Sequence, residues 1–216
     1  MKVNKIQKSK LRKPKALIDT CEQLDASPAC VLGWIDQFEP TIPTVHTEYQ
    51  SCLTFLQNYQ GSADTFNTYR REVERHMQWA WLIAKKSIFE LEPTELHAYM
   101  AFVQKPPQSW IGIKNVSRFI ENNGIRLHNP EWRPFVARIA KSKHKQGHAP
   151  QTKHYQMNNQ SIASILAVLS TFYSFLQQSE LISKNPVQML RQKSRYLQKK
   201  QSQHVTRRLT QTQWVF

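Results

Sequence analysis

Three histidines are the first side chains in this sequence that could do chemistry, because they stand close together at His144, His148 and His154. The first two are four residues apart, which is the spacing of a metal-binding pair on one face of a helix. Gly147 and Pro150 disfavour a helix there, and no nearby cysteine or carboxylate completes a ligand set. We therefore interpret them as histidines of a basic loop, and we expect no metal and no other cofactor.

The motifs of the common enzyme classes are missing from the sequence. It contains no GxxxxGK(S/T) phosphate loop, no GxSxG and no GxGxxG. A nuclease of the carboxylate–metal type needs paired acids, and the basic C-terminal part has almost none. The cysteines Cys21, Cys30 and Cys52 are odd in number and form no CxxC pair, which favours reduced, structural thiols. The sequence offers no complete active site, and we do not expect this chain to be an enzyme on its own.

Arginines on one expected helix are placed to bind nucleic acid. Apolar residues at spacings of three and four predict a long helix over 63–84. On its other side Arg71, Arg75 and Gln78 lie at i, i+4 and i+7, which predicts one outward stripe suited to phosphates or guanine edges. The alternative is a solvated helix face with pairs such as Arg71–Glu74.

Hydroxyl side chains form a second candidate surface, on a helix expected over about 159–178. Opposite its apolar stripe stand small hydroxyl residues instead of the usual charged ones, namely Ser161, Ser164, Ser170, Thr171 and Ser174. Hydroxyl groups could donate to phosphates, and their small size would let the helix approach a DNA groove closely. The alternative is tight packing against a neighbouring helix, for which small residues also serve.

Helices must position these side chains, and the apolar periodicity predicts several of them. We expect helices at about 45–59, 63–84, 93–104, 111–122 and 159–178, and a short one that follows NPEWRPF and reaches Ala140. No segment alternates convincingly with a period of two, and only five glycines are present, so an all-α fold is expected. Residues 16–43 hold at most one short helix, and 141–154 are expected to form a basic loop.

Positive charge is concentrated at the two ends of the chain. The net charge is +15; residues 1–15 hold seven basic residues and no acid, and residues 132–216 hold 14 basic residues and one acid. Such segregation indicates a polyanionic partner, with nucleic acid as the first candidate. The candidate DNA-binding residues are Thr65, Thr68, Arg71, Arg75, Lys85, Lys86, Lys143, Lys145, Lys153, Ser161, Ser164, Thr171, Arg191, Lys193 and Arg195.

Several strings together resemble the core-binding domain of tyrosine recombinases, the phage integrase family. One pattern opens a long helix and leads into the next, with Ser62, Thr65, Tyr69, Leu91, Glu95, Tyr99 and Phe102. Another is similar to the family's last core-binding helix and its Asn-Pro exit, with Ile162, Leu166, Leu169, Phe172, Tyr173, Phe175, Leu176, Leu181, Ile182, Asn185 and Pro186. RRLTQTQW, at 207–214, resembles the start of the family's catalytic domain.

This resemblance implies a SAM-like, all-α core-binding domain of four to five helices, with an inserted helical segment at 105–154. In the family such a domain covers one face of a DNA duplex during DNA integration and site-specific recombination. Catalysis belongs to a second domain whose motifs do not occur in this sequence, so no catalytic role is carried over. The implied partners are double-stranded DNA and other recombinase protomers on the same site.

We therefore expect a basic arm and a poorly defined segment at 1–44, the core-binding domain at 45–192, and a basic linker with the start of a missing catalytic domain at 193–216. Two other functions stay open, a stand-alone DNA-binding regulator that competes for recombinase sites and a helical module that binds RNA or protein. No run of about 18 apolar residues is apparent, and no apolar signal region follows the N-terminus. We expect a cytoplasmic location, with neither a membrane nor a small-molecule partner.

Overall fold

Residues 13–190, which the computed structural model describes, are predominantly helical. The α-helices are α1 (Ala29–Ile35), α2 (Val45–Gln57), α3 (Ala63–Trp79), α4 (Pro93–Gln104), α5 (Lys141–Lys145) and α6 (Asn159–Gln178). The strands are β1 (Ile111–Gly112), β2 (Phe119–Asn122), β3 (Ile125–His128) and β4 (Phe135–Val136). The 3-10 helices are η1 (Cys21–Gln23), η2 (Asp36–Phe38), η4 (Ile88–Glu90), η5 (Gln108–Trp110) and η6 (Thr152–His154), and a π-helical turn, η3 (Ala80–Ala84), continues α3.

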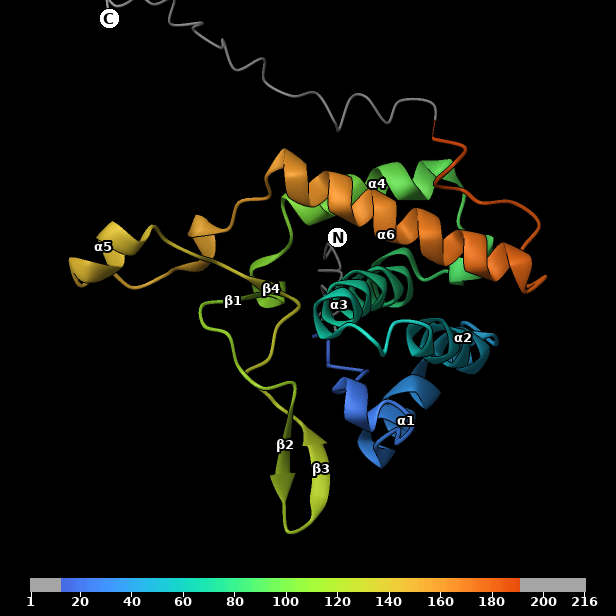
Figure 1. The fold of residues 1–216 in the computed structure, drawn as a ribbon, viewed down its shortest axis with the longest axis horizontal. Helices are drawn as coiled ribbons and strands as arrows, with labels where there is room; N and C mark the ends of the chain where they lie inside the picture. The colour runs from blue at the N-terminus through green and yellow to red at the C-terminus, as the bar shows by residue number, and fades with distance from the viewer. Residues whose placement is uncertain (1–12, 191–216) are drawn as a thin grey trace, which may run out of the picture.

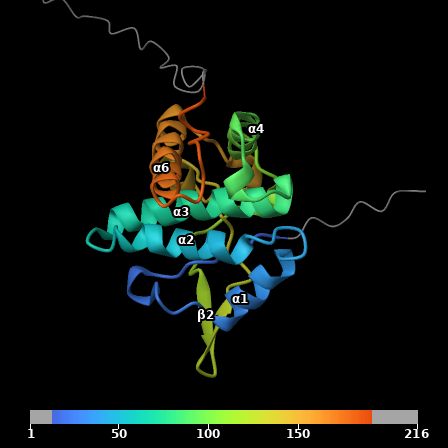
Figure 2. The ribbon, with the colours of Figure 1, turned by 90° about the vertical axis from the view of Figure 1, so that its right-hand side faces the viewer.

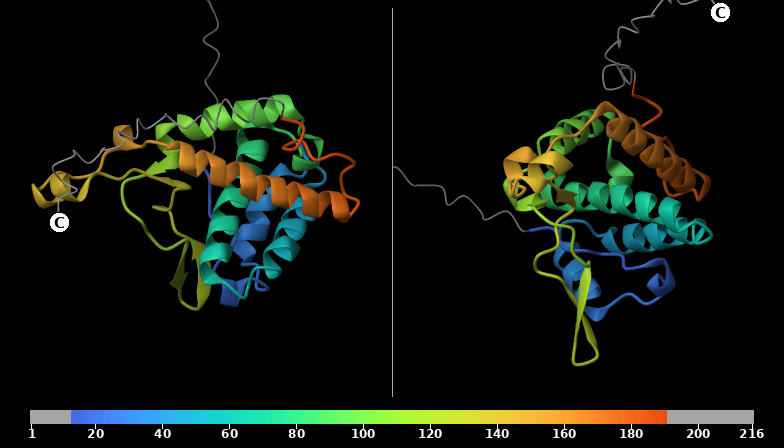
Figure 3. Two further views of the ribbon diagram at one scale, coloured as in Figure 1. Left: turned by 45° about the horizontal axis from the view of Figure 1, so that its top comes forward. Right: turned by 60° about the vertical axis from the view of Figure 1, so that its left-hand side comes forward.

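The helices are arranged in levels around α3. Figure 2 shows α2 and α3 side by side in the middle, α4 and α6 above them, and α1 below with the β2–β3 hairpin. In Figure 3 α6 crosses over α3 rather than running along it. The hairpin and the segment around α5 both extend away from the helices, in different directions (Figure 1). The long helices predicted at 45–59, 63–84, 93–104 and 159–178 are confirmed, to within a few residues at their ends.

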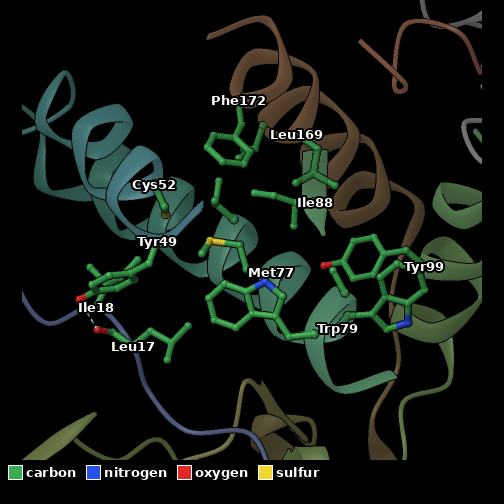
Figure 4. Packing of buried hydrophobic residues seen from close by; sticks show 14 of the residues in the cluster. Leu17, Ile18, Tyr49, Cys52, Met77, Trp79, Ile88, Tyr99, Leu169 and Phe172 are labelled. Atoms are coloured by element: carbon green, nitrogen blue, oxygen red, sulfur yellow. Dashed lines mark hydrogen bonds between the residues drawn. The ribbon is translucent and has the colours of Figure 1, made fainter. Parts of the chain in front are cut away.

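One hydrophobic core joins the helices, because each long helix turns its apolar side inward. Figure 4 shows Met77 of α3, Tyr99 of α4 and Phe172 of α6 among the buried side chains. α6 is long and apolar enough to cross a membrane by length and composition alone. In this structure, however, eight of its residues are buried against the rest of the domain, as in the core helix of a soluble protein.

The ends of α6 are fixed by two asparagines. The side chain of Asn158 accepts a hydrogen bond from the backbone N–H of Ser161 at 2.7 Å, which caps the first turn. At the other end Asn185 is buried and donates to the Ser170 carbonyl at 2.9 Å and to the Ser174 hydroxyl at 3.0 Å. Asn185 thereby ties the chain that leaves the helix back onto the helix.

The segment before α1 is better ordered than the sequence suggests. Ala16, Leu17 and Ile18 are buried in the core, and the backbone N–H of Leu17 donates to the Glu74 carboxylate at 3.0 Å. The hydroxyl of Tyr49 donates to the Leu17 carbonyl at 3.2 Å (Figure 4). Three apolar residues are too few to show a period, so the description of 1–44 as a poorly defined segment is wrong for this part.

The helix predicted at 111–122, and the short one reaching Ala140, do not form. β2 and β3 pair antiparallel, with Asn122 opposite Ile125, and β1 pairs parallel with β4. Asn123 and Gly124 both have positive φ, of 50° and 73°, as a two-residue hairpin turn requires. Asn-Gly between apolar residues is a hairpin signal, and here it outweighs the loose helical spacing. The fold is therefore mostly helical rather than all-α, and the 105–154 insertion is only partly helical.

Candidate nucleic-acid interface

A cleft of about 930 Å³ lies between α3, the segment 115–138 and the start of α6. Its basic lining consists of arginines, with no lysine, and these are Arg70, Arg71, Arg75, Arg118, Arg126, Arg133 and Arg138. Three carboxylates also line it, Asp19, Glu72 and Glu74, so positive charge is in excess by four. Arginine binds phosphates through a planar fork of donors and stays charged at any physiological pH. A cleft of this composition could accommodate a phosphate group.

The predicted stripe on α3 is only partly correct. Arg71 is available, since 47% of its side chain is exposed while its Nε contacts the Glu72 carboxylate at 2.6 Å. The Arg75 side chain is only 12% exposed, and its Nε donates to the Pro134 carbonyl at 2.7 Å. Gln78 is fully buried and accepts from the backbone N–H of Lys15 at 2.9 Å. The stripe fails at Arg75 and Gln78 because the 115–138 segment and the N-terminal segment cover that side of α3.

Arg75 holds the wall of the cleft together. Its guanidinium group contacts the buried Glu72 carboxylate at 3.0 Å and lies 4.5 Å from the centre of the Phe135 ring. This set of contacts joins α3 to β4. We therefore assign Arg75 a structural role in shaping the cleft, in place of the predicted DNA contact.

Two further arginines that line the cleft are paired with buried carboxylates. Arg118 forms an ion pair with the buried Glu74 carboxylate, and its Nε donates to the Ile18 carbonyl at 2.7 Å. Burial lowers the pKa of Arg118, the nearby charge of Arg70 adds to this effect, and the Asp19 carboxylate opposes it. Arg126, in β3, pairs with the buried Asp19 carboxylate. These pairs join the 115–138 segment to α3 and to the N-terminal segment, and they compensate the charge of both arginines.

Uncompensated charge remains at Arg133 and Arg138. Arg133 donates to two backbone carbonyls, of Pro130 at 2.7 Å and Trp132 at 2.6 Å, which leaves its charge in place. Arg138 is exposed and makes no ion pair within residues 13–190. In addition, Nε of Arg70 is buried without a hydrogen-bond partner in the described part of the chain, which is uncommon in native structures. Donors for an anion are thus present and unused.

The hydroxyl surface of α6 divides into two parts. Ser161 and Ser164 line the cleft, as expected for residues facing a ligand. Ser174, in contrast, accepts hydrogen bonds from Asn185 at 3.0 Å and Gln188 at 3.2 Å, so it serves packing. Thr171 is exposed outside the cleft, and its hydroxyl donates to the Ala167 carbonyl at 3.0 Å. Ser174 thus makes contacts within the protein, whereas contact of Ser161 and Ser164 with a ligand stays a prediction.

A second basic segment, residues 139–157, connects the cleft-lining segment to the start of α6. This segment, called the arm, is separate from the basic residues predicted to form an arm at the N-terminus. It contains α5 and η6, and Lys141, Lys143, Lys145 and Lys153 on it are all exposed. His148 is exposed as well, and His154 accepts a hydrogen bond from the backbone N–H of Gln151 at 3.0 Å. Within the described residues no group of three or more His, Cys, Asp or Glu side chains could hold a metal ion. The arm therefore adds exposed charge next to the cleft.

The remaining candidate residues lie elsewhere. Thr65 and Thr68 are half-buried on α3 and do not line the cleft. Lys85 and Lys86 follow η3, and Lys86 forms an ion pair with Glu95 at 2.6 Å. Arg191, Lys193 and Arg195 fall outside the residues that the structure describes, as do most of the basic residues of 1–15 and the predicted linker at 193–216. The structure thus brings together Arg71, Ser161 and Ser164, with the lysines of the arm nearby.

Sequence reasoning missed the arginines of the insertion. These arginines are spread over 21 positions and show no helical spacing, namely Arg118, Arg126, Arg133 and Arg138. Because helical spacing was the signal that grouped residues on one face, it could not group these four. A signal was nevertheless present, because from 115 to 140 every basic side chain apart from histidine is an arginine. Comparison with known proteins adds no further guide, since no family model, no curated protein and no solved structure matches this chain.

Proposed function

We propose that this chain binds double-stranded DNA, as a core-binding domain of the tyrosine recombinase type that holds DNA rather than cutting it. The observation that carries the proposal is the cleft lined only by arginines among its basic residues, continuous along the chain with an arm of exposed lysines. A polyanion is the partner that such a surface attracts. The resemblance in the long helices, which agree with the predicted ranges, favours DNA over other polyanions.

The expected mode of binding is contact with the phosphate backbone. The arm extends from the helical levels (Figure 1), so its lysines can reach a convex duplex that the cleft itself cannot enclose. Arg71 and Arg138 stand at the cleft with exposed side chains and would add contacts from the body of the domain. Such contacts position the protein and carry little sequence information.

The proposal is tested by titrating a fluorescent duplex of random sequence over a salt series. If Arg71, Arg138 and the four lysines of the arm each neutralise one phosphate, the plot of log Kobs against log salt has a slope of about −5.4. Replacing Lys143 and Lys145 with alanine should reduce the slope by about 2. Lys184→Ala changes an exposed lysine beyond the far end of α6 and should leave the slope unchanged.

Three results would contradict the proposal. Binding that does not change between low and physiological salt would exclude a phosphate-directed mechanism. Single-stranded RNA that displaces the duplex at lower concentration than unlabelled duplex would favour the RNA-binding alternative. If the protein binds neither nucleic acid, the remaining class of function is a protein-interaction module.

A further inference from the structure

The arginine-lined cleft differs in shape from a surface that follows a duplex. Duplex DNA presents its phosphates on a convex cylinder, and proteins read it by placing a convex helix or ribbon in a groove. Here the hollow is on the protein, and its floor is formed by side chains such as Arg75 and Arg118, which are only 12% and 14% exposed. An intact duplex can therefore touch the rim of the cleft but cannot enter it.

Charged and uncharged polar side chains occupy different parts of the cleft. Uncompensated charge stands at Arg133 and Arg138, and Arg71 is exposed although it shares Glu72 with Arg75. Arg118 and Arg126 are paired with Glu74 and Asp19. The walls carry uncharged amides and hydroxyls, among them Asn115, Gln156, Gln160, Ser161 and Ser164. The three amide side chains are exposed and form no hydrogen bond within residues 13–190.

Such a division matches an unpaired nucleic-acid strand. Phosphates pair with the exposed arginines, and amides of Asn and Gln can form paired hydrogen bonds with base edges. In a single strand the Watson–Crick edges of the bases are free to accept those bonds, whereas in a duplex they are occupied. The volume of about 930 Å³ falls in the range of pockets that enclose a ligand of small-molecule size, which is suitable for a short single-stranded segment.

We propose that the cleft binds the unpaired strand at a duplex end or gap, while the arm holds the adjoining duplex. This inference rests on the proposed DNA-binding function and adds a substrate class to it. The aromatic side chains Phe119 and Trp132 of the cleft are buried and covered by arginine side chains, so bases cannot stack on them. The third, Tyr155, is half-buried, with its hydroxyl donating to the Val103 carbonyl at 3.0 Å and its ring centre 5.3 Å from that of Phe135. We therefore expect phosphates and base edges to be the main groups that the cleft contacts.

The test compares three labelled DNAs, a blunt duplex, the same duplex with a short unpaired extension, and the single strand alone. We expect the extended duplex to bind about tenfold more tightly than the blunt one, which corresponds to about 1.4 kcal/mol. Equal affinity for the blunt and extended duplexes would overturn the inference while leaving the proposed function intact. Absence of binding to all three would overturn both.

Variants that fill the cleft without changing charge connect this preference to the site. Ser164→Phe places a large side chain in the cleft wall and should lower the affinity for the extended duplex to that for the blunt duplex. Thr171→Phe changes an exposed hydroxyl residue of the same helix outside the cleft and should retain the preference. Ser161→Phe provides a second filling variant if Ser164→Phe does not give the helical circular dichroism spectrum of the parent. A filled cleft with unchanged preference, or with equal loss on both duplexes, would overturn the assignment.

Discussion

The buried histidine of α3 gives the stability of this domain a defined dependence on pH. His76 is fully buried, and its Nε2 lies 2.8 Å from the hydroxyl of Tyr173 in α6. That hydroxyl donates to the Ile88 carbonyl at 3.2 Å, so Nε2–H of a neutral imidazole must donate to it. Nδ1 has no hydrogen-bond partner within the described residues. A proton added there would be a charge in the core without a counter-ion.

The size of the effect follows from the two pKa values. Burial lowers the pKa of His76 from 6.5 to about 3 in the folded protein, whereas the unfolded chain titrates near 6.5. Between these values only the unfolded state takes up the proton, so the free energy of unfolding falls as the pH falls from about 7 toward 3. From pH 7 to pH 5 the loss attributable to this residue is about 2 kcal/mol.

Urea unfolding at pH 7, 6 and 5 measures this loss. The matched variant His76→Phe keeps an aromatic ring next to Tyr99 and Trp79, which His76 contacts at ring-centre distances of 4.6 Å and 6.1 Å. The parent should lose about 2 kcal/mol more than the variant between pH 7 and pH 5. Burial also lowers the pKa of His128. Because His128 is present in both proteins, its contribution to the pH dependence of unfolding cancels in the comparison. An equal pH slope in the two proteins would refute the neutral, buried state assigned to His76.

Three further changes test other contacts. Arg75→Ala should lower the free energy of unfolding by about 2 kcal/mol, which is less than for a fully unpaired buried charge because Arg71 still contacts Glu72. The control Arg71→Ala should change the free energy of unfolding by under about 0.5 kcal/mol. Equal losses for the two variants in urea titrations would contradict the structural role of Arg75. Asn185→Ala removes the hydrogen bonds that join the chain exit to α6 and should lower the thermal unfolding midpoint, with a cost of about 2 kcal/mol; an unchanged midpoint would show that these bonds contribute little. Gly124→Ala places a side chain at φ +73°, at a cost of about 1–2 kcal/mol, and should reduce amide-exchange protection in the β2–β3 hairpin but not in α6.

The sequence by itself determined the positions of the long helices and the separation of positive charge along the chain. Apolar spacing located α2, α3, α4 and α6 because each of these helices buries one side and is long enough to show the period. The distribution of charge pointed to a polyanion, since it depends only on composition along the chain. Neither inference requires knowledge of which helix contacts which.

Tertiary structure decided the remainder, because it depends on contacts between distant residues. An Asn-Gly turn with strand pairing replaced the helix expected at 111–122, and three buried residues before α1 filled the core without showing a period. Whether an arginine is free or paired could not be read from α3 alone. Glu72 lies on the same helix as Arg75, but the carbonyl that fixes Arg75 comes from Pro134, 59 positions away. The cleft exists only where α3, the 115–138 segment and α6 meet, so the sequence supplied its arginines and the fold determined which of them are exposed and which are paired.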